Sequence, residues 1–182
     1  MWHLEAFELA PTASLPRLWI GLFTLVLVAG QAWATPWEIR GQVVGIADGD
    51  SITVLTADKK QYKVRLAGID APEQAQPFGQ RSKQSLSDLV FRKEVRVEVH
   101  AKDRYTRQVG IVYEGSVNIN QQQVARGLAW AYRQYLGKLP KSFAKALLDS
   151  EEQARSDKRG LWVDKSPTPP WQWRRQKRDE SR

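Results

Sequence analysis

The chain has 182 residues, a net charge of +8, two histidines and no cysteine. This length suits one domain with short appended segments, and the lack of cysteine excludes disulfide scaffolds, cysteine–zinc sites and thiol nucleophiles. Apolar residues form 42% and aromatic residues 10% of the chain, which is enough for a packed core. The positive charge favours polyanionic partners: nucleic acid, anionic lipid or acidic polysaccharide.

The N-terminal segment has the layout of a secretory signal peptide. Residues 18–30 form an apolar run preceded by Arg17, and an A-x-A pattern of small residues ends at Ala34. We therefore expect residues 1–34 to be a signal peptide cleaved after Ala34, which makes the protein secreted or periplasmic. The alternative is an uncleaved membrane anchor through residues 18–30, although a spanning helix needs about 20 residues.

Cleavage after Ala34 leaves 148 residues and raises the net charge to +9, because the removed segment carries Arg17 against Glu5 and Glu8. The remaining chain then contains a single histidine, His100. This excludes acid–base catalysis by a histidine pair and any multi-histidine metal site. We interpret His100 as a structural or surface residue.

Hydrophobic periodicity predicts the elements of one domain over residues 35–164. Alternating and β-branched residues predict strands over 37–47, 51–56, 62–66, 95–99 and 109–113. Helical spacing of apolar residues predicts helices over 79–92, 118–126 and 141–157. Five strands with three helices indicate a mainly β, α+β fold, a small five-stranded OB barrel.

A change of composition marks residues 165–182 as a C-terminal tail with six basic and two acidic residues. Its proline cluster forbids a continued helix, so we interpret it as an extended, polyproline-II-like arm that ends in disorder. We interpret Trp162 as covering the barrel or anchoring the tail. For Trp171 and Trp173, anchoring and stacking on nucleic-acid bases remain equally open.

Three short motifs carry acidic and basic residues in an unusual combination, followed by Asn120 and a Gly-Leu-Ala segment. The motifs are Asp-Gly-Asp-Ser at 48–51, Arg-Leu-Ala-Gly-Ile-Asp-Ala-Pro-Glu at 65–73 and Asp-Arg-Tyr-Thr-Arg at 103–107. Each alone is explained by turn formation, capping or surface charge. Together they contain what phosphodiester hydrolysis requires: ligands for a hard cation, a base and positive donors for the developing charge.

The residue types fit these three roles. Asp50 and Asp70 supply hard oxygen ligands suited to Ca²⁺ or Mg²⁺. Glu73, three residues beyond Asp70, can face the same cavity and act on a water molecule. Arg65 and Arg107 offer planar guanidinium groups that match phosphate with two hydrogen bonds.

These motifs closely resemble the thermonuclease family, also called staphylococcal or micrococcal nuclease-like, over residues 41–162. The resemblance implies an OB barrel with three helices and Ca²⁺ as cofactor. It also implies roles for individual residues: Asp50, Asp70 and the main-chain carbonyl of Ala71 as calcium ligands, and Arg65, Glu73 and Arg107 as the catalytic residues. In the family, water attacks phosphorus in line and the 5′-oxygen leaves, which gives 3′-phosphate products from DNA or RNA.

The resemblance extends to substrate binding. Arg104 and Tyr105 match residues that contact a terminal phosphate, and the base-stacking tyrosine corresponds to Tyr132 or Tyr135. Thr106 stands where glycine is usual in the Asp-Arg-Tyr-x-Arg loop. If that position requires a positive φ, a β-branched residue is strained there and shifts the following arginine.

We therefore expect an exported, calcium-dependent nuclease that acts on DNA and RNA as a monomer, without a stable protein partner. A membrane contact is expected only if the N-terminal segment stays uncleaved. The alternative is a catalytically weak or inactive OB-fold module that binds nucleic acid through the same basic surface.

Overall fold

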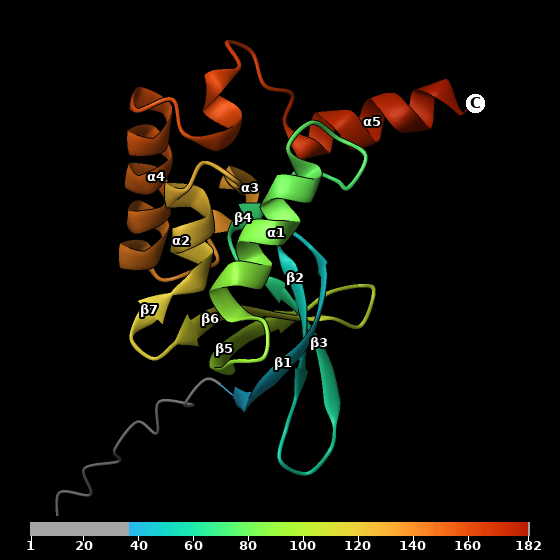
Figure 1. Ribbon diagram of the computed structural model, residues 1–182, viewed down its shortest axis with the longest axis vertical. Helices are drawn as coiled ribbons and strands as arrows, with labels where there is room; N and C mark the ends of the chain where they lie inside the picture. The colour runs from blue at the N-terminus through green and yellow to red at the C-terminus, as the bar shows by residue number, and fades with distance from the viewer. Residues whose placement is uncertain (1–36, 182) are drawn as a thin grey trace, which may run out of the picture. The chain divides into compact units, whose positions relative to one another are not determined.

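The computed structural model describes residues 37–181. Its strands are β1 (Glu38–Asp48), β2 (Ser51–Leu55), β3 (Gln61–Leu66), β4 (Ile69–Asp70), β5 (Glu94–Lys102), β6 (Gln108–Glu114), β7 (Val117–Asn118) and β8 (Trp130–Ala131) (Figure 1). Its helices are α1 (Gly79–Val90), α2 (Ile119–Ala125), α3 (Arg133–Leu136), α4 (Lys141–Ser156), the 3₁₀ helix η1 (Gly160–Val163) and α5 (Pro170–Glu180). The predicted signal peptide and the alternative anchor lie outside the described residues.

A closed mixed barrel is formed by β3, β2, β1, β5 and β6, in that order. Neighbours in this order pair antiparallel, and the barrel closes through parallel pairing of β3 with β6, where Val64 lies opposite Gln108 and Leu66 opposite Gly110. The predicted five-stranded OB barrel is confirmed. Closure removes the exposed edges that an open sheet would leave.

The barrel core follows from the two-residue period of its strands. Ile39, Gly41 and Val43 of β1 are buried and the residues between them are exposed, and Val95 and Val97 of β5 repeat the alternation. Val64 of β3 completes the same apolar cluster. These alternating strands therefore contribute one face to the core and one to solvent, whereas β6 has three consecutive buried residues, Gly110, Ile111 and Val112.

Helices cover the part of the barrel core that the strands leave open. Helix α1 packs against β1, and α2 lies between α1, β6 and α4 (Figure 1). Leu86 of α1, Val124 of α2 and Leu147 of α4 are fully buried in the barrel's apolar cluster. The three predicted helices are thus confirmed within one or two residues at their ends, and α3 and α5 are additions that the periodicity did not predict.

The predicted disorder at the end of the C-terminal tail is wrong, because residues 170–180 form α5. Pro169 is still extended, with φ −66° and ψ 147°, so the arm that precedes the helix agrees with the prediction. Pro170 then occupies the first helical position, where a missing N–H breaks no helical hydrogen bond. The residues that follow contain no further proline or glycine, so the helix continues.

Within residues 37–181, no helix combines the length and the hydropathy that crossing a membrane requires.

Candidate active site

The turn between β1 and β2 places Asp50 inside the domain. The N–H of Asp50 donates to the Asp48 carboxylate over 3.0 Å. The Gln123 side chain of α2 donates to the carbonyl of Gly49 over 2.8 Å and fixes the turn from the other side. The Asp50 side chain is only 4% exposed, so this carboxylate points inward and needs partners there.

Arg65 and Asp70 meet across the turn that joins β3 to β4. Gly68 adopts φ +73°, a left-handed conformation that costs glycine little, and so lets the chain reverse. Asp70 thereby returns toward the end of β3, and the Arg65 Nη2 atom lies 2.7 Å from Asp70 Oδ1 and 3.1 Å from Asp50 Oδ2. One guanidinium group therefore bridges the two buried carboxylates.

The buried carboxylates create a strongly negative, poorly hydrated place. Burial raises the pKa of Asp70 above its ordinary value, although the hydrogen bond from Arg174 lowers it. Burial, reinforced by the charge of Asp50, raises the pKa of the neighbouring Asp48 to about 6. Positive charge close to these groups is therefore favourable, whether it comes from arginine or from a metal ion.

The same place fits a hard cation. Ala71 is buried beside the two carboxylates, and its N–H donates to Asp50 Oδ2 over 3.1 Å, so its backbone lies next to them. Within the described residues, no group of three or more Asp, Glu, His or Cys side chains is arranged to hold a metal. Two carboxylates, a backbone carbonyl and water are a suitable donor set for Ca²⁺ or Mg²⁺, which prefer oxygen and retain water ligands.

Glu73 lies in the loop between β4 and α1, and Gln76 holds its backbone. The Gln76 side chain accepts from the N–H of Glu73 over 3.2 Å and donates to the carbonyl of Thr168 over 2.6 Å. Gln76 is buried. This single amide therefore joins the loop of Glu73 to the segment that leads into α5.

Arg174 of α5 reaches the same carboxylates. Its Nη2 atom lies 2.7 Å from Asp70 Oδ2, and its Nη1 atom lies 2.7 Å from Glu73 Oε1. Although burial lowers the pKa of the Arg174 guanidinium, its hydrogen bonds to Asp70 and Glu73 raise that pKa above its ordinary value. Arg174 is thus a permanently charged part of the site, which the sequence did not predict.

Arg107 is positioned by the loop between β5 and β6. Asp103 accepts hydrogen bonds from the N–H groups of Tyr105 and Arg107, at 2.8 and 3.0 Å, and from Arg107 Nε at 2.8 Å. Thr106 adopts φ 64°, so the position does require the left-handed conformation that disfavours a β-branched residue. The loop nevertheless holds Arg107 toward the site.

Hydrogen bonds and ion pairs connect the predicted metal ligands with the predicted catalytic residues. Arg107 Nη1 lies 3.3 Å from Ser51 Oγ, which donates to Asp50 Oδ1 over 2.9 Å. From Asp50 the network continues through Arg65 to Asp70 and through Arg174 to Glu73. Residues from three separate motifs therefore meet in one site.

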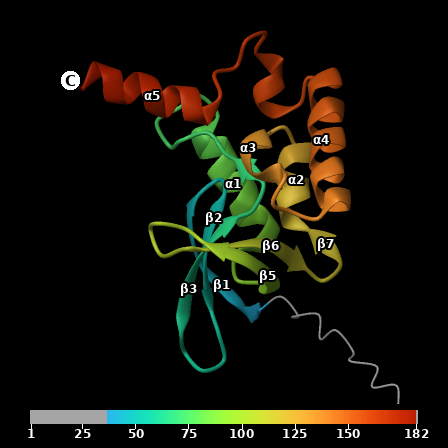
Figure 2. The ribbon, with the colours of Figure 1, turned by 180° about the vertical axis from the view of Figure 1, so that it is seen from behind.

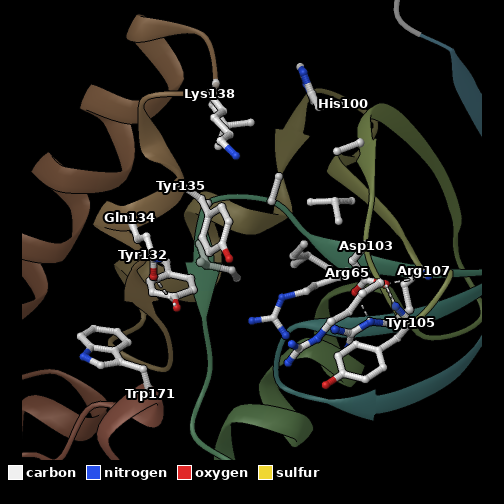
Figure 3. A pocket seen from close by; sticks show the side chains of 18 of the residues that line it. Arg65, His100, Asp103, Tyr105, Arg107, Tyr132, Gln134, Tyr135, Lys138 and Trp171 are labelled. Atoms are coloured by element: carbon white, nitrogen blue, oxygen red, sulfur yellow. Dashed lines mark hydrogen bonds and ion pairs between the residues drawn. The ribbon is translucent and has the colours of Figure 1, made fainter.

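A cavity of about 1100 Å³ opens beside this network. Figure 3 shows aromatic side chains of Tyr132, Tyr135 and Trp171 on one side of it and the guanidinium groups of Arg65 and Arg107 on the other. Arg104 and Tyr105 also line the cavity, and Tyr105 is 62% exposed. The predicted substrate-binding residues thus lie around one space, with an aromatic surface facing guanidinium groups.

A buried carboxylate holds the aromatic side of the cavity in place. Glu151 of α4 accepts from the N–H of Ala131 over 3.0 Å and lies 2.7 Å from Arg133 Nη2. Glu151 thus binds the backbone of Ala131 before Tyr132 and the side chain of Arg133 after it. Tyr132 and Tyr135 then pack edge to face, with ring centroids 4.9 Å apart, so both tyrosines contribute to this surface.

Comparison with known proteins identifies the family. The family model described as "Staphylococcal nuclease homologue" matches residues 63–164, more than half of the chain. The chain belongs to the staphylococcal nuclease family. The match includes Arg65, Asp70, Glu73 and Arg107 and ends before α5.

Curated relatives agree with this assignment. An "Uncharacterized endonuclease" of Haemophilus influenzae is 49% identical over 137 residues, 75% of this chain and 74% of the relative. A "Micrococcal nuclease" of Shigella flexneri is 43% identical over 160 residues, 83% of this chain and 87% of the relative. "Protein ParB" of Escherichia coli is 41% identical over 168 residues, 86% and 90% of the two chains. The chain is a phosphodiester-hydrolysing nuclease.

Two residues of the nuclease site escaped sequence reasoning for different reasons. Gln76 lies in a loop, where no periodicity indicates which way a side chain points. Arg174 is 104 residues from Asp70 along the chain. The available signal was helical spacing behind Pro170, which places Trp171 and Arg174 three residues apart on one face.

Proposed function

We propose that this nuclease is an exported, calcium-dependent enzyme that cleaves DNA and RNA by in-line attack of water and leaves 3′-phosphate products. The observation that carries the proposal is the continuous network from Arg107 through Asp50, Arg65 and Asp70 to Glu73. It brings oxygen ligands, a carboxylate base and two guanidinium groups together beside the cavity, which Arg65, Glu73 and Arg107 line.

The metal ligands in this proposal are Asp50, Asp70 and the carbonyl of Ala71. Both carboxylates are buried and already share the positive charge of Arg65, which supports a preference for a cation at this place. When bound, Ca²⁺ supplies Lewis-acid polarisation of a phosphate oxygen and offsets the charge that develops on it.

Side chains of the protein activate water, bind the phosphate and stack on a base. Glu73 orients the attacking water or accepts its proton, since its carboxylate faces the same cluster as Asp70. Arg65 and Arg107 bind the equatorial phosphate oxygens, where planar guanidinium groups stabilise the charge that grows in the transition state. Tyr132 and Tyr135 stack on a base, while Arg104 and Tyr105 contact a terminal phosphate.

The metal requirement is tested by incubating plasmid DNA and total RNA with the enzyme in Ca²⁺, in Mg²⁺ and in EGTA. Cleavage of both substrates in Ca²⁺ and loss of cleavage in EGTA is the expected result. Persistent cleavage in EGTA contradicts the calcium assignment. The product ends are tested with labelled oligonucleotides, whose fragments should resist polymerase extension until a phosphatase removes the 3′-phosphate.

The residue roles are tested by Glu73→Gln and Arg65→Ala. Loss of one transition-state donor lowers turnover roughly 10²–10³-fold, and loss of a general base has a comparable effect. Two exposed residues provide matched controls: Glu152→Gln on α4 and Arg40→Ala on β1. Each removes the same charge as the corresponding site variant. Normal turnover by Arg65→Ala would refute its role.

Export is tested by N-terminal sequencing of the protein recovered outside the cytoplasm. A mature chain that begins at Thr35 is expected from cleavage after Ala34. A protein that keeps residues 18–30 and fractionates with membranes supports the anchored alternative instead.

A further inference from the structure

Helix α5 directs one face toward the nuclease cavity. The α5 residues that line the cavity are Trp171, Arg174, Arg175 and Arg178. Their spacing of three, four and seven residues from Trp171 places all of them on one side of a helix. The acidic residues of α5, Asp179 and Glu180, do not line the cavity, so the α5 residues that do are three arginines and one tryptophan.

The first turn of α5 is held firmly. Trp171 stacks on Tyr132 with ring centroids 5.3 Å apart and 7° between the ring planes, and it also packs edge to face against Trp130. Gln76 ties the preceding segment through Thr168, and Pro170 is buried. The sequence left stacking and anchoring open for Trp171. The structure shows that it extends the aromatic surface begun by the two tyrosines.

The second half of α5 has free positive charge. Arg175 and Arg178 are exposed, and within residues 37–181 neither guanidinium group makes an ion pair or a hydrogen bond. Arg174, by contrast, is neutralised by Asp70 and Glu73. Figures 1 and 2 both show this half of α5 extending beyond the barrel, so its arginines continue the positive surface outward from the cavity.

We infer that the cavity-facing side of α5 is an additional subsite for single-stranded nucleic acid, in which Arg175 and Arg178 bind backbone phosphates beyond the one that is cleaved. This inference rests on the proposed nuclease function of the cavity. The ligand class follows from the chemistry: unpaired guanidinium groups match phosphate oxygens, and the adjoining aromatic surface suits unstacked bases. A strand whose scissile phosphate lies at Arg65 and Arg107 meets α5 at the same cavity.

An anionic membrane surface is the competing partner for a basic helix that contains tryptophan. The observations favour nucleic acid, because an interfacial helix needs an exposed apolar face. Trp171 is already stacked on Tyr132, and the ring of Trp173 packs under the Lys177 ammonium group, 5.3 Å from its centroid. What α5 offers to a partner is therefore charge beside an enzymatic cavity.

The test is the salt dependence of binding by the full chain and by an Arg175→Ala/Arg178→Ala double variant. The probe is a fluorescein-labelled single-stranded DNA of about 12 nucleotides, within the span of an OB fold, measured by anisotropy in EGTA to prevent cleavage. Loss of two phosphate contacts should reduce the slope of log affinity against log salt by about 1.4 and weaken binding roughly tenfold near 0.1 M salt.

A charge-matched control separates a defined subsite from general attraction. Lys63→Ala/Lys93→Ala removes two exposed cations that do not line the cavity. If both double variants change the slope equally, or if neither changes it, the subsite inference is overturned. It is also overturned if the α5 variant binds DNA normally but loses binding to phosphatidylglycerol vesicles.

Turnover distinguishes this inference from the proposed function. The α5 double variant should lose more kcat/KM on the long oligonucleotide than on a dinucleotide. The single internucleotide phosphate of a dinucleotide is the one that is cleaved, so no further backbone phosphate is present for Arg175 and Arg178. If the wild-type chain neither binds nor cleaves nucleic acid, the proposed function fails. If the wild type cleaves and the variant loses equally on both lengths, only the α5 inference fails.

Discussion

Arg174 Nη1 lies 2.7 Å from Glu73 Oε1, although 101 residues separate the two in the chain. The same guanidinium group also binds Asp70, which burial makes reluctant to carry a charge. An arginine from the C-terminal helix thus satisfies two acidic residues of the nuclease site. Any cation that binds Asp70 shares that carboxylate with Arg174.

Replacing Arg174 therefore has opposite effects on folding and on cation binding. Arg174→Ala should lower the free energy of unfolding in EGTA by about 1 kcal/mol, a value reduced because its side chain is 36% exposed. It should also tighten Ca²⁺ binding, since Asp70 loses a competing positive charge. Urea unfolding and calorimetric Ca²⁺ titration measure the two effects.

Lys177→Ala provides the control for Arg174→Ala on the same helix, because Lys177 pairs with Glu180 and does not line the cavity. Weaker Ca²⁺ binding by the Arg174 variant, with normal binding by the control, contradicts the competition.

Asn120 should be far more sensitive to substitution than Gln122 of the same helix. It is fully buried, donates to the carbonyls of Ala67 and Gly110, and accepts from the N–H of Val112. Asn120→Ala removes the partner of the Val112 N–H and of the Ala67 carbonyl, while the Gly110 carbonyl still accepts from the N–H of Ala67, and should cost about 3 kcal/mol. Urea denaturation measures this cost, and Gln122→Ala on the same helix should cost under about 1 kcal/mol. Equal losses in both variants would contradict a special role for Asn120.

Replacing Thr106 with glycine should stabilise the fold. Its φ of 64° burdens a β-branched residue, and relief of that strain exceeds the entropy that glycine loses on folding. Thr106→Gly should raise the free energy of unfolding by about 0.5–1 kcal/mol and preserve or increase turnover. Thr106→Ala keeps the Cβ atom and should gain less. A loss of stability in the glycine variant alone excludes strain at this position.

Asp103 should make the stability of the Arg107 loop depend on pH. Burial raises its pKa, but hydrogen bonds from Arg107 and the backbone outweigh this and bring the pKa below its ordinary value of 3.8. A lowered carboxyl pKa contributes stability above pH 3.8, and that contribution is lost as the pH falls through the lower folded value.

Asp103→Asn should accordingly be less stable than the wild type at pH 7, and the difference should shrink on acidification. Thermal unfolding of both proteins at pH 7 and below pH 3.8 gives the comparison. Asp88→Asn, on the outer part of α1, supplies the matched control. A stability difference that is constant with pH would show that Asp103 does not act through its charge.

Local sequence patterns were sufficient to predict the strands and helices whose apolar residues recur with a regular period. The alternation of Val95 and Val97 and the helical spacing of Leu86 and Val90 place apolar side chains on one face whatever the rest of the chain does. The carboxylate and arginine motifs likewise carry the resemblance that assigned Asp50, Arg65, Asp70, Glu73 and Arg107. The structure gathers these residues, and their individual roles stay predictions.

The sequence did not determine the backbone conformation of the loop that contains Thr106. A threonine in place of glycine indicates strain at residue 106 only if φ is positive there, and φ depends on how Asp103 folds the loop around Arg107. The tail shows the same limit. Its prolines correctly exclude a helix that continues from η1, yet Pro170 is equally suited to begin a new one.

The sequence by itself determined the strand and helix periods, the chemical types available to the site and the excess of positive charge. Only the tertiary structure decided that β3 pairs with β6, that Glu151 clamps the aromatic surface and that α5 brings Arg174 to Asp70 and Glu73. The physical reason is that side-chain period is a local property of the backbone. Contacts between distant residues depend instead on how whole elements pack, and a charged side chain in an isolated segment carries no sign of the partner that packing will give it.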